Sequence, residues 1–359
     1  MRPMTTLPRD LPSLEVPPGP RVAEPLPADR PTRWGILATG AIARGFAEDL
    51  ALLPEAAIAA VGSRRLASAA EFASQYDATP YGSYEELVAD PDVDVVYVAT
   101  PHALHKEHTL LAFEAGKPVL CEKALTLNAP DAQELVDAAR ANGLFLMEAM
   151  WMRCNPLIRR LAQLASDGAL GQVRQVRADL GFLVERPDTH RLLAPELGGG
   201  VLLDMGIYPL NFADLFLGEP DQVSAAATLA ESRIDLDLSL SLGYPGGAVS
   251  SLSATMTAWS PRTASIATDR GRVDLAAPFH EPRQATWTSE GSSETITEEV
   301  IGTGLANEAL EVIRCLRNGE VESPLAPLDR SVSLMRLMDR IREQIGVSYD
   351  ADSRLSSAD

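Results

Sequence analysis

The sequence predicts an α/β fold in which a doubly wound parallel sheet is followed by an α+β domain with a large, mostly antiparallel open sheet. Between residues 33 and 151, short apolar runs alternate with helical stretches, as they do in parallel βαβ units. After residue 151, runs with period-two alternation are separated by turn residues, which indicates antiparallel hairpins.

In the first half, the apolar runs mark the strands. Residues 93–100 (VDVVYVAT) form a near-continuous apolar run, which is typical of a strand buried on both faces. Residues 105–115 are helical in pattern and end at Gly116, a natural helix C-cap. The other expected strands are 34–37, 57–61, 118–121 and 144–147, and the other expected helices are 42–53, 68–76 and one that starts at Asn128.

In the second half, the turns mark the hairpins. Residues 176–184 alternate apolar with polar or small side chains, as a half-buried strand does. Residues 236–244 and 248–256 flank a Pro-Gly-Gly turn, and residues 264–268 and 272–275 flank an Asp-Arg-Gly turn. Helices are expected again at 305–318 and 329–345.

Residues 1–32 are rich in proline, which lacks an amide donor and has a fixed φ. This composition predicts an extended N-terminal arm. The simpler expectation is a mobile tail, and the alternative is an arm that wraps over a neighbouring surface.

Composition excludes several classes of partner. With 31 basic and 50 acidic residues the formal charge is -19, which argues against nucleic acid because phosphate backbones bind Lys/Arg surfaces. No stretch reads as a membrane span, and no apolar segment follows Arg2 and Arg9 as a signal peptide requires. Cys121, Cys154 and Cys315 lie far apart, so we expect reduced thiols in a cytoplasmic protein.

The turn after the first expected strand carries a dinucleotide-binding signature. Residues 35–43 read as a degenerate G-x-G-x-x-G/A motif in which Ala38 replaces the first glycine. Gly40 would let the backbone approach a pyrophosphate at a helix N-terminus, as in a Rossmann domain. The alternative is a tight turn that binds nothing. The predicted cofactor contacts here are Ala38, Thr39, Gly40, Ala41 and Ile42.

Ser63, Arg64 and Arg65 follow the second strand, where the residue that recognises the ribose is expected. NAD enzymes usually carry an acid there. A hydroxyl and two guanidiniums suit a 2′-phosphate instead, so NADP is favoured over NAD. The alternative is a pair of solvated arginines at a helix start.

Two further pairs are candidates for chemistry. Glu122 and Lys123 end a strand at the carboxyl edge of the parallel sheet, where α/β folds bind ligands, although a surface ion pair explains them equally. Asp204 and Tyr208 are spaced i,i+4 and share one helix face. They could equally be a helix N-cap and a core aromatic, and spacing alone leaves this open.

Three segments strongly resemble the Gfo/Idh/MocA oxidoreductase family: ATPHALHKEHTLLAFEAGKPVLCEK, LFLMEAMWMR and GGGVLLDMGIYPL. The likeness runs from about Arg33 to about Val347 and is nearest to the branch of dimeric dihydrodiol dehydrogenases that also act as NADP-dependent D-xylose dehydrogenases. In this family an E-K-P motif supplies a lysine at the nicotinamide, and a D-x-x-x-H/Y motif supplies an acid and an acid–base partner. The resemblance implies Lys123, Asp204 and Tyr208 as catalytic residues.

The resemblance also implies their roles. Tyr208 is expected to act as acid/base, Lys123 to lower the pKa of the phenol and to donate to substrate, and Asp204 to orient them. An exchange of roles between Lys123 and Tyr208 stays open. Ala124 replaces the proline of the family motif, so the ring that stiffens the chain after the lysine is missing.

The same resemblance places Thr100, Pro101, His102 and His105 along the cofactor, together with Glu122 and Lys123. Trp151 is implied to contact substrate, or alternatively to be a domain-interface aromatic, and Arg153 is expected to wall the cleft. The histidines at 102, 105 and 108 drift around a helix and no carboxylate or cysteine joins them at ligand spacing, so no metal is expected.

Together these interpretations predict an N-terminal arm (1–32), an NADP-binding Rossmann domain (33–151), a substrate and oligomerisation domain (152–347) and a C-terminal tail (348–359). The expected reaction is hydride transfer between NADP and a C–OH group of an aldopyranose such as D-xylose or of a cyclic diol. Two alternatives are a relative that recycles tightly bound NAD(P) within one turnover and a non-catalytic NADP-binding regulator. The resemblance implies a homodimer or tetramer formed through the C-terminal sheet, with no nucleic-acid or membrane partner.

Overall fold

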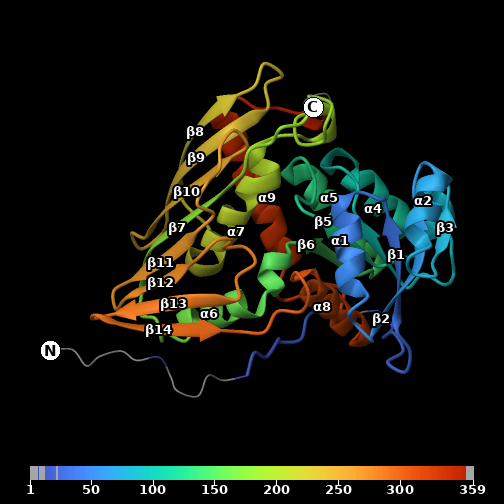
Figure 1. Cartoon of the computed structure of the whole chain (residues 1–359), viewed down its shortest axis with the longest axis horizontal. Coiled ribbons are helices and arrows are strands. Elements are labelled where there is room, and N and C mark those ends of the chain that lie inside the picture. Colours follow the sequence, from blue (N-terminus) through green and yellow to red (C-terminus); the bar gives the residue numbers. More distant parts are fainter. Residues whose placement is uncertain (1–6, 8–12, 22, 353–359) are drawn as a thin grey trace. The chain divides into compact units, whose positions relative to one another are not determined.

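The computed structural model describes residues 7, 13–21 and 23–352 (Figure 1). The chain divides into two compact units. The parallel-sheet unit consists of Val16–Cys154 and Ile301–Met335, and the antiparallel-sheet unit consists of Met1–Glu15, Asn155–Val300 and Arg336–Asp359.

The parallel-sheet unit contains a six-stranded, fully parallel sheet with the order β3-β2-β1-β4-β5-β6. This confirms the predicted doubly wound sheet. The three-residue strand β3 was not expected, because it is too short to show a period. The strands are β1 (Thr32–Leu37), β2 (Ala56–Gly62), β3 (Thr79–Tyr81), β4 (Val95–Val98), β5 (Val119–Glu122) and β6 (Leu146–Ala149), and the helices are α1 (Ala41–Leu50), α2 (Leu66–Ala73), α3 (Tyr84–Val88), η1 (His102–Leu104), α4 (His105–Glu114), α5 (Ala129–Asn142), η2 (Trp151–Cys154) and α8 (Leu305–Arg317).

Burial explains why these strands read as apolar runs. Every residue of β4, β5 and β6 is buried, so no face of these strands selects polar side chains. In the core, the ring of Phe46 from α1 lies 5.3 Å from the ring of Trp34 and 4.0 Å from the ring of Tyr97. These aromatic contacts fix α1 on strands β1 and β4.

Residues 301–335 lie in the parallel-sheet unit, although they come from the part of the sequence assigned to the second domain. The buried carboxylate of Asp49, in α1, accepts hydrogen bonds from the backbone amides of Thr303 (2.9 Å), Gly304 (3.1 Å) and Ala306 (3.0 Å). These amides begin α8, so an acid on one helix satisfies the donors of another that is more than 250 residues away in the sequence.

The proline-rich arm packs on the same unit. The Pro20 carbonyl accepts the Val321 amide at 2.9 Å, and the Leu26 amide donates to the Leu316 carbonyl at 3.0 Å. Residues 20, 21 and 23–26 therefore follow α8 and the loop after it, as the wrapping alternative expects and a mobile tail does not.

The antiparallel-sheet unit contains an eight-stranded sheet with the order β14-β13-β12-β11-β7-β10-β9-β8, in which only the pairing of β10 with β7 is parallel. Both predicted hairpins are confirmed as β9–β10 and β11–β12. The strands are β7 (Val173–Gly181), β8 (Gln222–Leu229), β9 (Asp235–Gly243), β10 (Val249–Thr255), β11 (Ala264–Thr268), β12 (Arg272–Leu275), β13 (Gln284–Ser289) and β14 (Ser292–Thr297).

One face of this sheet is covered by α7 (Ile207–Leu217), which packs on β7 and β10 (Figure 1). Among the described residues, the stretch Pro195–Leu217 is long and apolar enough to cross a membrane, which corrects the expectation that no stretch would be. However, 83% of its apolar window is buried inside the protein, as in the core helix of a globular domain. The other helices here are α6 (Pro156–Ser166), η3 (Pro195–Leu197) and η4 (Leu202–Gly206), and α9 (Leu328–Ile345) runs from one unit into the other.

Candidate active site

The turn between β1 and α1 leaves a helix N-terminus open. Ala38 has a φ of 87°, the left-handed region that glycine adopts most easily, and its amide donates to the Gly62 carbonyl at 3.0 Å. Gly40 is the N-cap of α1, no side chain caps the helix, and a Cβ added at Gly40 would meet nothing within 4 Å. Free amides, open space and a first turn without acids fit a pyrophosphate. Thr39, Ala41 and Ile42 are each at least partly exposed in this turn.

Ser63, Arg64 and Arg65 lie at the carboxyl end of β2, beside the turn just described. Ser63 is buried, and its hydroxyl accepts the Arg65 amide at 3.4 Å. Arg64 and Arg65 are exposed, and no acidic residue lies in the first turn of α2, which follows them. Two solvent-facing guanidiniums at an uncapped helix start suit an anionic group.

The segment after β4 is fixed by a buried histidine. His105 is fully buried, with Nδ1 2.8 Å from the Ala124 carbonyl and Nε2 2.8 Å from the Thr100 carbonyl. Burial, reinforced by His102, lowers the pKa of His105 to about 3, so the ring is neutral. A neutral ring carries one N–H, so it donates to only one of these two carbonyls; it lies between the Thr100–Pro101 turn and the chain just after Lys123. His108 Nδ1 lies 3.0 Å from the Thr100 hydroxyl, and the His102 ring lies 5.6 Å from the His105 ring.

No three histidine, cysteine or acidic residues gather as a possible metal site in the part of the chain that the structure describes.

Glu122 holds the end of β5. Its carboxylate accepts the Tyr97 hydroxyl at 2.5 Å and the Lys123 amide at 3.2 Å. The peptide bond between Lys123 and Ala124 is cis. Glu122 therefore fixes the backbone from which the Lys123 side chain starts, and its carboxylate oxygens are used within the protein.

Glu148, on β6, is a residue that the sequence analysis missed. Its carboxyl group accepts the Leu125 amide at 3.0 Å and the Ser331 hydroxyl at 2.6 Å. Burial raises the pKa of Glu148, while these hydrogen bonds and the charges of Arg153 and Lys123 oppose the rise. The two cations thus lie close enough to act on one buried acid. The acid inside the apolar run of β6 is the signal from which it was predictable.

Trp151 and Arg153 lie in η2, directly after β6, and both are buried. Burial lowers the pKa of the Arg153 guanidinium to about 10, an effect that Glu148 opposes. Arg153 therefore forms part of a buried charged cluster with Glu148.

Asp204 and Tyr208 lie on consecutive turns of one buried helical segment in the antiparallel-sheet unit. Asp204 is in the π-helical turn η4, a type of insertion that is frequent at functional sites, and Tyr208 is the second residue of α7. Arg191 Nη1 donates to Asp204 Oδ1 at 3.0 Å, and the His280 ring lies 4.9 Å from the Tyr208 ring. Arg191 and His280 were not predicted, because they lie in irregular loops whose sequence carries no period.

The structure therefore places Asp204 and Tyr208 in one unit and every other predicted site residue in the other. Within the parallel-sheet unit, those residues gather after strands β1, β2, β4, β5 and β6, at the carboxyl ends of the strands. This is the edge at which open α/β sheets bind ligands.

Comparison with known proteins gives this arrangement a context. Residues 32–150 match the Gfo/Idh/MocA description "Oxidoreductase family, NAD-binding Rossmann fold", and residues 158–274 match a "GFO/IDH/MocA C-terminal domain". The chain is 37% identical to trans-1,2-dihydrobenzene-1,2-diol dehydrogenase of Bos taurus over 335 residues (89% of this chain, 98% of that protein). It is 36% identical to the Homo sapiens enzyme of the same name (90% and 99%).

Solved structures agree with these sequence matches. The fold is similar to that of an aldose-aldose oxidoreductase from Caulobacter crescentus complexed with glycerol, with a TM-score of 0.81, 26% identity, and coverage of 88% of this chain and 97% of that one. It is also similar to the 3-ketoreductase KijD10 from Actinomadura kijaniata in complex with NADP and TDP-benzene, with a TM-score of 0.79, 26% identity, and coverage of 88% and 98%.

Proposed function

Because the chain belongs to the Gfo/Idh/MocA oxidoreductase family, we propose that it is an NADP-dependent dehydrogenase of a cyclic diol or of an aldopyranose such as D-xylose. It is an oxidoreductase of the sugar or diol dehydrogenase type, which acts on CH–OH groups. The observation that carries the finer proposal is the buried pair Asp204 and Tyr208, with Arg191 on the acid.

The residues of the parallel-sheet unit fit a dinucleotide phosphate. The open N-terminus of α1 at Gly40 would take the pyrophosphate, and Arg64 and Arg65 would take a 2′-phosphate by charge and by their fork geometry. When bound, NADP supplies the acceptor for the hydride. The KijD10 structure contains NADP, which is consistent with this cofactor.

The protein's own residues move the proton. Oxidation of a C–OH group needs a base for the hydroxyl proton, and we assign this role to the phenol of Tyr208. To Lys123 we assign the role that the family resemblance implies, that of an ammonium which favours the phenolate and donates to substrate. Asp204, itself held by Arg191, orients the reacting groups. Trp151 is proposed to contact substrate.

The assembly and the location are part of the same proposal. Alternate residues of β10 are exposed on one face of the eight-stranded sheet, and a hollow of about 420 Å³ is lined by leucine, alanine and hydroxyl-bearing residues of β7–β10 together with Asp237 and Ser260. We propose that this face forms the contact between subunits of a homodimer or tetramer. Sedimentation velocity measures the oligomeric state and tests this assignment. The three buried free thiols Cys121, Cys154 and Cys315 support a cytoplasmic location, because oxidising compartments favour disulfides.

The deciding experiment follows absorbance of the reduced nicotinamide with purified protein, NADP or NAD, and a panel of D-xylose, D-glucose and trans-cyclohexanediol. We expect turnover with NADP on at least one substrate, and loss of at least about 100-fold in kcat for Tyr208→Phe, the range of general acid–base catalysis. Tyr244→Phe, which removes a buried hydroxyl bonded to Ser250 at 3.0 Å in the same unit, is the matched control. Absence of turnover, with nucleotide released on denaturation, would replace the proposal by the bound-cofactor alternative; NADPH binding without any turnover would favour the regulator.

A further inference from the structure

A buried carboxylate lies under the start of the helical segment that carries Asp204 and Tyr208. Asp235, the first residue of β9, is fully buried, and its Oδ2 accepts the Leu202 amide at 2.6 Å. Leu202 begins η4, so this bond fixes the first turn of the segment two residues before Asp204. Asp235 Oδ1 has no hydrogen-bond partner among the described residues.

A tyrosine from the C-terminal end of the chain reaches the same loop. Tyr349 is buried, and its hydroxyl donates to the Gly199 carbonyl at 2.8 Å. The phenol is held in turn by the Arg342 guanidinium, which lies 5.1 Å from its ring centroid. The Asp352 carboxylate fixes both residues, because it accepts hydrogen bonds from Arg342 Nη1 at 2.6 Å and from the Tyr349 amide at 2.9 Å.

Gly200 shows how closely these groups meet. It has a φ of 134°, and a Cβ there would lie 2.3 Å from Asp235 Oδ1 and 3.1 Å from the Tyr349 hydroxyl oxygen. Only glycine fits both the conformation and the space. The loop formed by residues 198–200, which lies before η4, therefore packs closely against Asp235 at Gly200. The Tyr349 hydroxyl binds the carbonyl of the preceding residue, Gly199.

We infer that Asp235 and Tyr349 are positioning residues for the reaction, which hold the backbone of Gly199–Leu202 so that Asp204 and Tyr208 keep their places. This inference rests on the proposed function for the roles of Asp204 and Tyr208. Neither residue needs to touch substrate. They act through one carbonyl and one amide of the loop that leads into the catalytic segment.

The charge of Asp235 contributes to this hold. A carboxylate accepts an amide more strongly than a protonated carboxyl group does. The groups that face it are the Leu202 amide and its own amide, Tyr349 from the C-terminal segment, and Arg342 from α9. Burial raises the pKa of Asp235 to about 6, with the amides and Arg342 opposing, so the hold is expected to weaken below about pH 6.

The test compares Tyr349→Phe and Asp235→Asn with the control Tyr244→Phe, which removes an equally buried hydroxyl of the same unit. Turnover is expressed per NADPH-binding site, titrated by nucleotide fluorescence, so that unfolded protein does not count. We expect kcat to fall roughly tenfold in both variants with KM for NADP unchanged, as for a small misplacement of catalytic groups. Amide hydrogen exchange of peptides that cover residues 198–208 is expected to speed up, while exchange in β1–β6 stays as in the wild type.

Two outcomes overturn the inference. One is unchanged exchange in residues 198–208 of Tyr349→Phe; the other is faster exchange there with kcat per site equal to that of Tyr244→Phe. Failure of the proposed function is seen separately, as absence of wild-type turnover or as full activity in Tyr208→Phe. The acid limb of log kcat gives a further readout, because a limb near pH 6 should disappear in Asp235→Asn.

Discussion

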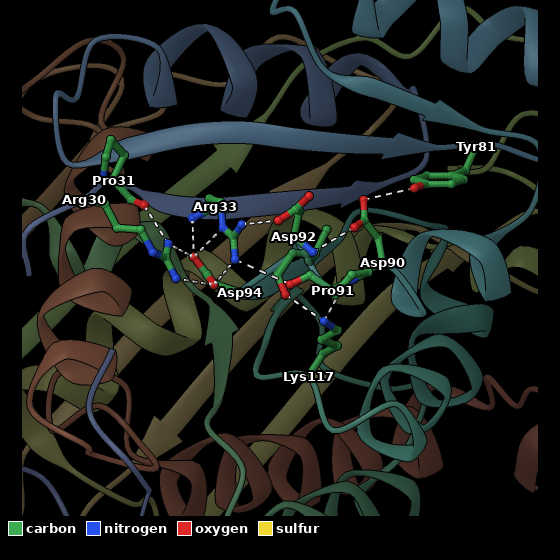
Figure 2. A network of polar contacts seen from close by, with 10 residues as sticks. Arg30, Pro31, Arg33, Tyr81, Asp90, Pro91, Asp92, Asp94 and Lys117 are labelled. Atoms are coloured by element: carbon green, nitrogen blue, oxygen red, sulfur yellow. Dashed lines mark hydrogen bonds and ion pairs between the residues drawn. The ribbon is translucent and has the colours of Figure 1, made fainter. Parts of the chain in front are cut away.

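Replacing Asp94 with asparagine tests whether a charged network fixes the beginning of the nucleotide-binding sheet (Figure 2). Asp94 precedes β4, and its carboxylate accepts the Arg33 amide at 2.8 Å, Arg30 Nη2 at 2.9 Å and Arg33 Nη2 at 3.2 Å. It therefore joins the end of the N-terminal arm and strand β1 to the turn before β4. The side chain of Asp94 is only 7% exposed, whereas those of Arg30 and Arg33 are 36% and 30% exposed.

These exposures set the expected magnitude. Two partly exposed ion pairs contribute about 0.5–1 kcal/mol each after solvent screening. Loss of the charge that strengthens the buried amide bond costs about 1 kcal/mol more. We expect Asp94→Asn to lower the free energy of unfolding by about 2–3 kcal/mol, which corresponds to roughly 4–12 °C in Tm for a domain of this size.

Differential scanning calorimetry at neutral pH measures the shift, and Asp92→Asn is the control. Asp92 is bonded to the same Arg33, but its side chain is 74% exposed, so we expect a change below about 0.5 kcal/mol. Equal Tm shifts for the two variants would refute the reasoning, because they would show that the burial of Asp94 does not make its interactions more stabilising than those of exposed Asp92.

The pH dependence gives a second check on Asp94. Burial alone would raise its pKa, but the hydrogen bonds from Arg30 and Arg33 outweigh burial and hold the pKa below its ordinary value of 3.8. A depressed folded-state pKa gives stability that is present above pH 3.8 and is lost as the pH falls through the folded value. The Tm difference between wild type and Asp94→Asn should therefore narrow in strong acid, and a constant difference would contradict the assignment.

Two further predictions concern the same unit. Glu308, in α8, is fully buried with neither carboxyl oxygen hydrogen-bonded among the described residues, and burial, followed by Glu122 and Asp49, raises its pKa well above 4.5. A raised folded-state pKa makes the stability of the wild type fall as the pH rises above 4.5. Calorimetry should therefore show that Glu308→Gln raises Tm relative to the wild type by more at pH 8 than at pH 5. An equal rise at both pH values would contradict the prediction. Replacing Arg64 and Arg65 by alanine should raise KM for NADP by about 10-fold or more and leave KM for NAD nearly unchanged in steady-state kinetics, since each charge-assisted contact contributes about 1.5–3 kcal/mol before screening. Parallel rises for both cofactors would show that these arginines do not bind the 2′-phosphate.

Much of the fold was predictable because it depends on local pattern. Strands such as β4 and β5 are buried on both faces, so their apolar runs are visible without any knowledge of neighbours. The β9–β10 hairpin was marked by the Pro-Gly-Gly turn between its strands. The glycine turn was readable because an open helix N-terminus needs residues without bulky side chains, and the family resemblance added Lys123, Asp204 and Tyr208, whose roles stay predictions.

The strands and contacts that escaped prediction lack such a local signal. Strand β8 (QVSAAATL) has small residues at both its half-buried and its exposed positions and no fully buried residue, so its alternation is weak. Glu148 was visible only as an acid in an apolar strand, and its partner Ser331 is 183 residues away in the sequence. Nothing in the sequence around either residue indicates that the two side chains are partners.

The sequence by itself determined most strands of the parallel sheet, two hairpins of the antiparallel sheet, the glycine turn after β1 and the chemistry of the candidate side chains, because these depend on residues that are close along the chain. Only the tertiary structure decided that α8 joins the parallel-sheet unit through Asp49, that Arg191 binds Asp204, and that Tyr349 reaches the loop before Asp204. The physical reason is the same in each case. A buried carboxylate or carbonyl is stabilised by a donor, and which donor it meets depends on packing between segments far apart in the sequence.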